Sequence, residues 1–248
     1  MIVIAPMAGG DAPFEKQGYP HCKWLVEVGG KPLIEHVWNN LRCLGGDRYV
    51  FLIRKEDALR YHLAEVLKLL DPRAIVLQTE APTAGAACTV LLGIEHIALD
   101  EELVVTNGDQ LILADLAEAV GAFRARKLDG GTIVFDSVHP RWSFVLTDDE
   151  GLVIEAAEKR PISRTATAGF YYFRTGAMFV EGARSMIRKD AHVNGQFYVC
   201  PVFNEMILRQ AAIGVYPIDR SKYLSLATPQ NVEEYERYLA AEQKERLP

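Results

Sequence analysis

Residues 1–10 read MIVIAPMAGG, an apolar run that ends at two glycines. Aliphatic and β-branched residues fill positions 2–5, and a short run of this kind is typical of a buried strand. No basic segment precedes the run, so we expect a first strand here rather than a signal peptide. The glycines mark the turn at which this strand ends.

Short β-branched runs alternate with longer amphipathic stretches along the rest of the chain. This alternation predicts an α/β fold with a mostly parallel central sheet flanked by helices. The expected strands are residues 2–6, 49–54, 74–78, 103–106, 132–136, 143–147 and 169–173. The expected helices are residues 32–44, 56–70, 85–98, 113–127, 176–188, 199–212 and 231–243.

The pattern changes after Asp129, where short strands follow one another through turns. The sequence DDEG at residues 148–151 is typical of a hairpin turn, so we expect a small antiparallel part in the second half. No repeat, low-complexity tract or linker indicates a boundary between domains. We therefore expect a single domain over residues 1–248.

The overall charge and the cysteines limit the kinds of partner. The chain has 248 residues and a formal net charge of −6, which would repel the phosphate backbone of a nucleic acid on average. No segment approaches the roughly 20 apolar residues of a membrane helix. Four scattered cysteines show no metal-ligand or disulfide spacing. We expect a cytoplasmic protein that binds neither nucleic acid nor membranes.

The turn PMAGGD, residues 6–11, is the first candidate site. Small residues let the backbone approach a ligand, and the N–H groups of such a turn can face an anion. The turn is not a dinucleotide fingerprint, because GxGxxG is absent, and GGK at residues 29–31 is not a P-loop, because Pro32 follows it. From these residues alone, a phosphate cradle and an ordinary tight turn both stay open.

Two charged residues are further candidates. Asp109 follows the expected strand 103–106, and a carboxylate at the carboxyl end of a parallel strand can hold Mg²⁺ against phosphate oxygens. Lys23 comes soon after the glycine turn and can offset the charge of a triphosphate. Each has an ordinary alternative, since an aspartate often caps a turn and most lysines are solvated surface charges.

In this order and spacing, the motifs resemble those of the sugar-nucleotidyltransferase-like family, which has the Rossmann-like nucleotide-diphospho-sugar transferase fold. The family signature is a glycine-rich turn, a lysine and a GKP-L/M-I segment. These match MAGG at residues 7–10, Lys23, and GKPLI at residues 30–34. The resemblance covers nearly the whole chain, and it implies that residues 1–128 bind a nucleotide and residues 129–248 an acceptor.

The resemblance also implies roles for individual residues. Lys23 and Asp109 are expected to be catalytic, with Asp109 and Ser225 as the Mg²⁺ ligands. Nucleotide contacts are expected from Met7, Ala8, Gly9, Gly10, Gln78, Gly85, Ala86, Asn107 and Gly108. Acceptor contacts are expected from Glu158, Lys159, Gly169, Tyr171 and Asn194. Core packing is expected for most aromatic residues of the second half, with one or two on the acceptor wall: Trp142, Phe170, Tyr171, Tyr172, Phe197 and Tyr198.

The implied reaction moves a nucleotidyl group from a nucleoside triphosphate to a phosphorylated sugar or a similar small phosphate acceptor, releasing pyrophosphate. A pyrimidine nucleotide, CTP or UTP/dTTP, is preferred because no clear purine signature is present. The patterns HPRWS at residues 139–143 and NGQFY at residues 194–198 are similar to those of a capsule-locus subgroup. This implies a role in capsule or surface polysaccharide synthesis, and it leaves a homo-oligomer open.

Three positions depart from the family pattern. Pro13 stands where an arginine is usual, Asp11 where a glycine is expected, and Ser225 where an aspartate often serves as the second metal ligand. Two alternatives therefore stay open. One is a family 2-like glycosyltransferase that uses a nucleotide-sugar, although such enzymes usually carry a DxD-like pair. The other is a catalytically weakened, nucleotide-binding regulatory subunit.

Overall fold

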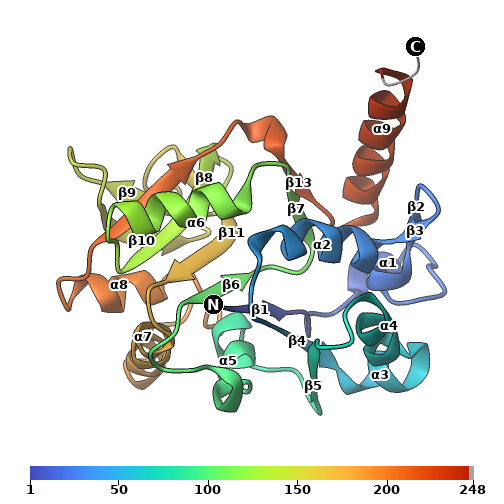
Figure 1. Cartoon of the computed structure of the whole chain (residues 1–248), viewed down its shortest axis with the longest axis horizontal. Helices are drawn as coiled ribbons and strands as arrows, with labels where there is room; N and C mark the ends of the chain where they lie inside the picture. The colour runs from blue at the N-terminus through green and yellow to red at the C-terminus, as the bar shows by residue number, and fades with distance from the viewer. Residues whose placement is uncertain (246–248) are drawn as a thin grey trace.

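Short apolar runs from both halves of the chain pair into one sheet of nine strands (Figure 1). The computed structural model describes residues 1–245. The strands are β1 (Ile2–Pro6), β4 (Arg48–Arg54), β5 (Ile75–Thr79), β6 (Leu103–Thr106), β8 (Gly130–Asp136), β9 (Ser143–Thr147), β10 (Val153–Glu158), β11 (Thr165–Phe173) and β12 (Ile213–Pro217). Their order is β10-β9-β11-β6-β1-β4-β5, with β8 beside β11 and β12 beside β8.

The first half of the chain supplies four parallel strands, and in the second half β12 runs parallel to β8. β1 lies between β4 and β6 and is parallel to both, and β5 extends the parallel part beyond β4. β11 runs antiparallel to β6, β8 and β9, and the β9–β10 pair is a hairpin closed at residues 148–151. The expected α/β class is confirmed, as are the antiparallel strands of the second half.

Helices cover both faces of the sheet. One face carries α2 (Leu33–Leu41), α4 (Leu63–Leu70) and α6 (Leu116–Ala125). The other face carries α5 (Ala86–Leu91), α7 (Gly176–Arg188) and α8 (Val202–Ile207). Side chains along β1 alternate between the two cores, because successive residues of a strand point to opposite faces. Val3 and Ala5 pack under α2, while Ile2 and Ile4 pack on the α5 side.

Two short ribbons extend this framework. β7 (Gln110–Ile112) pairs with β13 (Tyr223–Ser225), and β2 (Glu27–Val28) pairs with β3 (Lys31–Pro32). The first ribbon connects the segment after β6 to a segment more than a hundred residues away. It places Ser225 directly opposite Gln110.

All seven expected strands are present, but sequence patterning missed β7, β10, β12, β13 and the β2–β3 ribbon. The patterns of β10 (VIEAAE) and β12 (IGVYP) are weak, since glutamate, glycine and proline are all disfavoured in strands. β10 ends the strand order, and β12 lies beside β8 off the main path. Such peripheral positions tolerate weak strand formers. The ribbons are too short to give a periodic signal.

The expected helices are present but mostly shorter. The helix predicted over residues 56–70 is split into α3 (Lys55–Tyr61) and α4, because His62 adopts a left-handed conformation with φ 54° that ends a helix. The helix predicted from residue 113 begins at Leu116, where the Asp115 carboxylate accepts a hydrogen bond from the Glu118 N–H at 2.9 Å and caps it. Residues 42–44 continue α2 as a 3₁₀ turn, and residues 94–96 form a separate 3₁₀ turn after α5.

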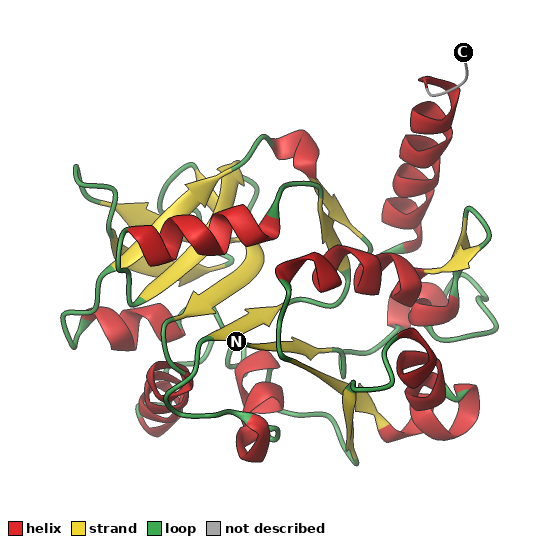
Figure 2. Ribbon diagram, viewed as in Figure 1, coloured by secondary structure: helices red, strands yellow, loops and turns green. Residues whose placement is uncertain are grey.

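The helix predicted over residues 199–212 is reduced to the six residues of α8, whereas α7 keeps its expected bounds. The last predicted helix lies within α9 (Pro229–Glu245), which projects from the body of the molecule (Figure 2). Val232 and Tyr235 of α9 are buried against the core. Among residues 1–245, no helix is both long enough and apolar enough to cross a bilayer.

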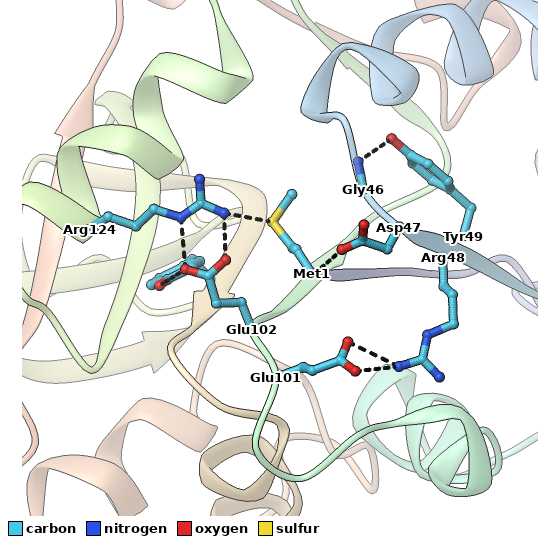
Figure 3. Close-up of polar contacts among 9 residues, drawn as sticks. Met1, Gly46, Asp47, Arg48, Tyr49, Glu101, Glu102 and Arg124 are labelled. Atoms are coloured by element: carbon cyan, nitrogen blue, oxygen red, sulfur yellow. Dashed lines mark hydrogen bonds and ion pairs between the residues drawn. The ribbon is translucent and has the colours of Figure 1, made fainter.

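Ion pairs connect the amino ends of the central strands. Figure 3 shows three: the Met1 amine with Asp47, Arg48 with Glu101, and Arg124 with Glu102. The Tyr172 hydroxyl also donates to Glu102 at 2.8 Å. The Arg124 guanidinium and this hydroxyl hold the pKa of Glu102 below its ordinary value. These three ion pairs hold the amino ends of the strands, whereas ligands of open α/β sheets bind at the carboxyl ends.

Candidate active site

A cleft of about 650 Å³ opens at the carboxyl ends of β1 and β6. On one side its walls come from residues 6–10, 82–89 and 107–109, which we call the glycine side. On the other side they come from residues 141–143, 158–159, 167–171 and 196–199, which we call the aromatic side. Residues 223–227, from β13 onward, join the two. Ligands in open α/β sheets bind at such a position.

The turn after β1 forms one wall of the glycine side. Ala8, Gly9 and Gly10 line the cleft, and a Cβ atom added at Gly9 or Gly10 would meet nothing within 4 Å. The missing side chains therefore leave open space beside the backbone. An anionic ligand can approach the backbone closely here.

Gly85 lies where the loop before α5 contacts another segment of the cleft wall. Its φ is +116°, and a Cβ there would lie 2.5 Å from both the backbone N and the backbone O of Phe197. Gly85 and Ala86 both line the cleft. The residue at position 85 is therefore fixed as glycine by backbone conformation and by close approach together.

Asp109 and Lys23 form an ion pair at the carboxyl end of β6. Lys23 Nζ lies 2.9 Å from Asp109 Oδ2, and the ammonium group also lies 4.6 Å from the centre of the Trp24 ring. The lysine side chain is 7% exposed and the aspartate 31%. Asp109 lines the cleft, whereas Lys23 lies outside its lining and reaches it through Asp109. The structure thus joins the two residues that the sequence proposed for catalysis.

Ser225 lies beside Asp109, so the structure brings together the two residues expected to bind Mg²⁺, and the metal role stays a prediction. The Leu226 N–H donates to the Asp109 carbonyl oxygen at 2.8 Å, and Ser225 and Asp109 both line the cleft. The Ser225 hydroxyl oxygen accepts a hydrogen bond from the Ala227 N–H at 3.3 Å. Within the described part of the chain, no three His, Cys, Asp or Glu residues gather into a possible metal site. Asp109 and Glu158 are the two carboxylates of the cleft lining, and Asp109 is the one beside Ser225.

Asp11 and Arg54 brace this region from outside the cleft lining. Asp11 is 2% exposed, and its Oδ2 lies 2.7 Å from Arg54 Nη2, while Arg54 also pairs with Asp57 at 2.8 Å. The Lys23 N–H donates to the same Asp11 oxygen at 3.4 Å. Burial raises the pKa of Asp11 despite these partners. The aspartate that departs from the family pattern therefore connects the Lys23 segment to the end of β4.

Glu158 is the last residue of β10 and Lys159 follows it; both line the aromatic side of the cleft. The Ser143 hydroxyl donates to Glu158 Oε2, and burial raises the pKa of this carboxyl above its ordinary value of 4.5. Lys159 Nζ donates to the Tyr198 hydroxyl at 2.7 Å and lies 4.8 Å from the centre of that ring. A buried carboxyl and an ammonium group therefore lie side by side on this wall.

Gly169 joins the two sides of the cleft. Its φ is +62°, and a Cβ there would lie 2.3 Å from Asn107 Nδ2 and 2.6 Å from Gln110 Oε1. The Asn107 N–H donates to the Gly169 carbonyl oxygen at 2.9 Å, and Gln110 Nε2 donates to the Ala168 carbonyl oxygen at 2.6 Å. A glycine is needed for β11 to approach the 107–110 segment this closely.

Four of the expected ligand residues lie outside the cleft lining. Met7 and Gly108 are buried behind it, with a Cβ at Gly108 2.5 Å from Met7 Cγ, so they support the wall from within. Gln78 is exposed on β5. Asn194 has φ 51° in a turn. Direct contacts from these four residues stay predictions.

Sequence reasoning missed several lining residues of the aromatic side. Arg141, Ser143 and Thr167 were not proposed, and Trp142 and Tyr198 were considered only as members of an aromatic group. The Arg141 guanidinium lies 4.3 Å from the centre of the Trp142 ring. The HPRWS pattern at residues 139–143 was the available signal, because it leads into β9 and places a cation next to an aromatic residue.

Comparisons with known proteins agree with this geometry. The family model described as Nucleotidyl transferase matches residues 19–197. The UTP–glucose-1-phosphate uridylyltransferase AglF of Haloferax volcanii is 26% identical over 227 residues, covering 89% of this chain and 88% of that protein. The bifunctional protein GlmU of Leifsonia xyli is 27% identical over 225 residues, which span 44% of its own length.

Two solved structures share the fold. The nucleoside-diphosphate-sugar pyrophosphorylase from Vibrio cholerae has a TM-score of 0.84 at 27% identity, covering 96% of this chain and 100% of that one. The inositol-1-phosphate CTP transferase from T. maritima has a TM-score of 0.75 at 15% identity, covering 96% and 94%. The second likeness concerns the fold alone. With the family model matching well over half of its length, the chain belongs to the nucleotidyl transferase family.

Proposed function

We propose that this protein transfers a nucleotidyl group from a nucleoside triphosphate to a phosphorylated sugar or a similar small phosphate acceptor and releases pyrophosphate. The observation that carries the proposal is the Lys23–Asp109 pair at the carboxyl end of β6, in a cleft whose opposite wall holds Lys159. A carboxylate and an ammonium group in the cleft lining, with a second ammonium group paired to that carboxylate, suit a reaction between two phosphate compounds.

In this reaction an oxygen of the acceptor phosphate forms a bond to the α-phosphorus. The bond from the α-phosphorus to its bridging oxygen breaks, and pyrophosphate leaves with the electron pair. An in-line displacement of this kind requires positioning and charge neutralisation more than covalent chemistry. Lys23 would offset charge on the triphosphate, and the open backbone at Gly9 and Gly10 would admit its phosphates.

The residues of the cleft fit a magnesium ion. Mg²⁺ usually keeps several waters and takes one or two carboxylates together with substrate phosphates, so Asp109 with a bound triphosphate is a sufficient set of ligands. Ser225, beside Asp109, would be the second protein ligand. Bound there, Mg²⁺ would neutralise phosphate charge during the displacement. Lys23 would then leave the carboxylate for the phosphates.

On the aromatic side, Lys159 would hold the acceptor phosphate and Glu158 would accept a hydrogen bond from an acceptor hydroxyl. Glu158 supports this role because it is buried yet lines the cleft, where its second oxygen is available to a ligand. Gly169 and Tyr171 would shape the floor of the acceptor site. These groups orient the acceptor and take no part in bond making.

A pyrimidine nucleotide is the proposed donor. The absence of a clear purine signature supports it, and the H. volcanii relative is named for UTP. The base would lie against residues 82–89, which line the glycine side next to the phosphate turn. We further propose, from the resemblance alone, that the product serves capsule or surface polysaccharide synthesis.

The test is pyrophosphate release in the presence of Mg²⁺, with CTP, UTP, dTTP, ATP and GTP each offered with sugar 1-phosphates and small phosphorylated alcohols. We expect release from at least one pyrimidine nucleotide, with a product whose mass equals acceptor plus nucleotidyl group, and release at least about a hundredfold slower from Asp109→Asn. Transfer from an intact nucleotide-sugar would instead indicate the glycosyltransferase. Nucleotide binding with neither reaction would indicate the regulatory subunit, and either result overturns the proposal.

A further inference from the structure

The segment of residues 193–198, which we call the 193–198 turn, reaches from the molecular surface to both sides of the cleft. Asn194 and Gly195 adopt left-handed conformations with φ 51° and 74°, and Val193 and Gln196 exchange backbone hydrogen bonds of 2.9 and 3.0 Å. The Gly195 N–H donates to His192 Nδ1 at 3.0 Å. Two consecutive left-handed residues with a closing bond are typical of a tight, ordered hairpin turn.

The backbone at the end of this turn pairs with the glycine side. The Phe197 N–H donates to the Ala84 carbonyl oxygen at 2.7 Å, and the Phe197 carbonyl oxygen accepts from the Ala87 N–H at 3.0 Å. Gly85 lies so close that a Cβ would approach the Phe197 backbone to 2.5 Å. The place of Phe197 is therefore set by the loop that is proposed to receive the nucleotide.

The next residue, Tyr198, contacts the aromatic side. Its hydroxyl accepts a hydrogen bond from Lys159 Nζ at 2.7 Å, and the same ammonium group lies 4.8 Å from the centre of its ring. Lys159 itself has a left-handed backbone with φ 54°, and its N–H donates to the Trp142 carbonyl oxygen at 3.0 Å. Backbone and side chain of Lys159 are thus each held by a separate contact.

We propose that Tyr198 is a positioning residue that holds the Lys159 ammonium group at the acceptor site, and that the pairing of Phe197 with the 84–87 loop sets the place of Tyr198. One short turn then fixes the nucleotide loop and the acceptor lysine relative to each other. The kinetic consequences of this link rest on the proposed function, whereas the contact between Tyr198 and Lys159 is independent of it. An in-line displacement requires the two substrates to be aligned, and a link between the nucleotide loop and the acceptor lysine helps to align them.

The kinetic test compares Tyr198→Phe, which keeps the ring, with Tyr198→Leu, which removes both contacts. We expect the acceptor KM to rise about fivefold in Tyr198→Phe, the factor that corresponds to one ordinary hydrogen bond, and further in Tyr198→Leu. The nucleotide KM should stay unchanged in both. Tyr216→Phe, at a half-buried tyrosine of β12 outside the cleft lining, is the matched control. An equal rise in both KM values would overturn the positioning role.

The link to the nucleotide loop is tested with Gly85→Ala, which pushes the loop away from Phe197. We expect it to raise the acceptor KM as well as the nucleotide KM, and to add little to the acceptor KM in a Tyr198→Leu background, because both changes release the same lysine. Fully additive effects on the acceptor KM would show that the two contacts act separately and would overturn the link.

A measurement without catalysis separates this inference from the proposed function. Acetic anhydride labels lysines, and the rate at Lys159 relative to the exposed Lys68 can be read by mass spectrometry in one sample. We expect Tyr198→Leu to raise this ratio about twofold or more, since the ammonium group loses a hydrogen bond and a ring contact. An unchanged ratio would overturn the inference whether or not the protein releases pyrophosphate.

Discussion

The two sides of the cleft are built in different ways. The glycine side follows parallel strands and presents small residues and backbone, with Asp109 as the charged side chain of its lining. The aromatic side comes from antiparallel strands and the 193–198 turn, and it presents long side chains such as Arg141, Trp142 and Lys159. Backbone contacts on the first side survive most substitutions, whereas each contact on the second depends on one side chain.

This difference predicts how activity responds to substitution. On the glycine side, we expect large effects at the Lys23–Asp109 pair, where charge is concentrated, and at glycines that permit close approach. On the aromatic side, we expect smaller effects spread over several residues, because orientation of the acceptor is shared among them. The predictions that follow test this contrast in order of decreasing effect.

The largest effect is expected from Lys23→Ala and Asp109→Asn. Each removes one charge from the partly buried pair, and loss of one such group at developing phosphate charge typically costs about a hundredfold or more in rate. Steady-state pyrophosphate release measures it, with Lys16→Ala at an exposed lysine as the control. A folded Asp109→Asn enzyme with full activity would remove the proposed mechanism.

On the glycine side, the sequence located several residues that line the cleft, because their signals are local. Gly9, Gly10 and Asp109 each lie within a few residues of the end of a strand, so recognising the strand also locates the residue. Lys23 and Asp109 are 86 positions apart in sequence. The order of the motifs indicated that both residues belong to one site, but it did not predict that they form an ion pair. The same locality explains why every strongly β-branched strand was found.

On the aromatic side, the contacts that matter depend on how strands pair. Ser143 meets Glu158 because β9 and β10 form a hairpin, and β10 was itself missed. Tyr198 meets Lys159 across 39 positions through a turn that no periodicity marks. Periodicity predicts which face of a helix or strand is buried, but it does not predict which element packs against that face. These contacts could therefore be seen only in the tertiary structure.

Gly169→Ala tests the point where the two sides meet. The new Cβ would collide with Asn107 and Gln110, in addition to the cost of about 1–3 kcal/mol for a left-handed non-glycine residue. We expect activity to fall about tenfold, because the 107–109 segment shifts. Gly151→Ala is the matched control: φ there is +74°, but the nearest atom lies 4.0 Å away, at Arg126.

Urea unfolding and pyrophosphate release are to be measured for both variants. Both should lose stability through the backbone, and Gly169→Ala alone should lose activity as well. Equal activity in the two variants would show that the approach of β11 to the 107–110 segment is unimportant for the reaction.

A smaller effect is expected from Ser225→Asp. The Ser225 hydroxyl bonds within its own turn, and a carboxylate there would face the same space as Asp109. We expect the half-saturating Mg²⁺ concentration to fall about threefold or more, since an added carboxylate strengthens a magnesium site. Ser225→Ala should raise this concentration, since it removes the weaker of the two proposed protein ligands. If both variants behave like the wild type, Ser225 does not face the metal.

The smallest effect, a pH dependence of stability, is expected from Glu158→Gln. Burial raises the pKa of Glu158 above 4.5 in the folded protein. In the pH window between 4.5 and this raised value, the folded state binds more protons than the unfolded state, so the stability of the wild type falls as pH rises through the window. A glutamine at position 158 does not titrate, and it can still accept the hydrogen bond from Ser143.

The unfolding free energy of Glu158→Gln minus that of the wild type should therefore grow as pH rises from 4.5 and then level off. Urea unfolding from about pH 4.5 to about pH 8 measures this difference. Glu155→Gln, at a carboxylate 44% exposed on the same strand, is the matched control and should show a flatter profile. If this difference in unfolding free energy shrinks with rising pH, the folded protein stabilises the charged form of Glu158. The aromatic side would then hold a stable anion beside Lys159.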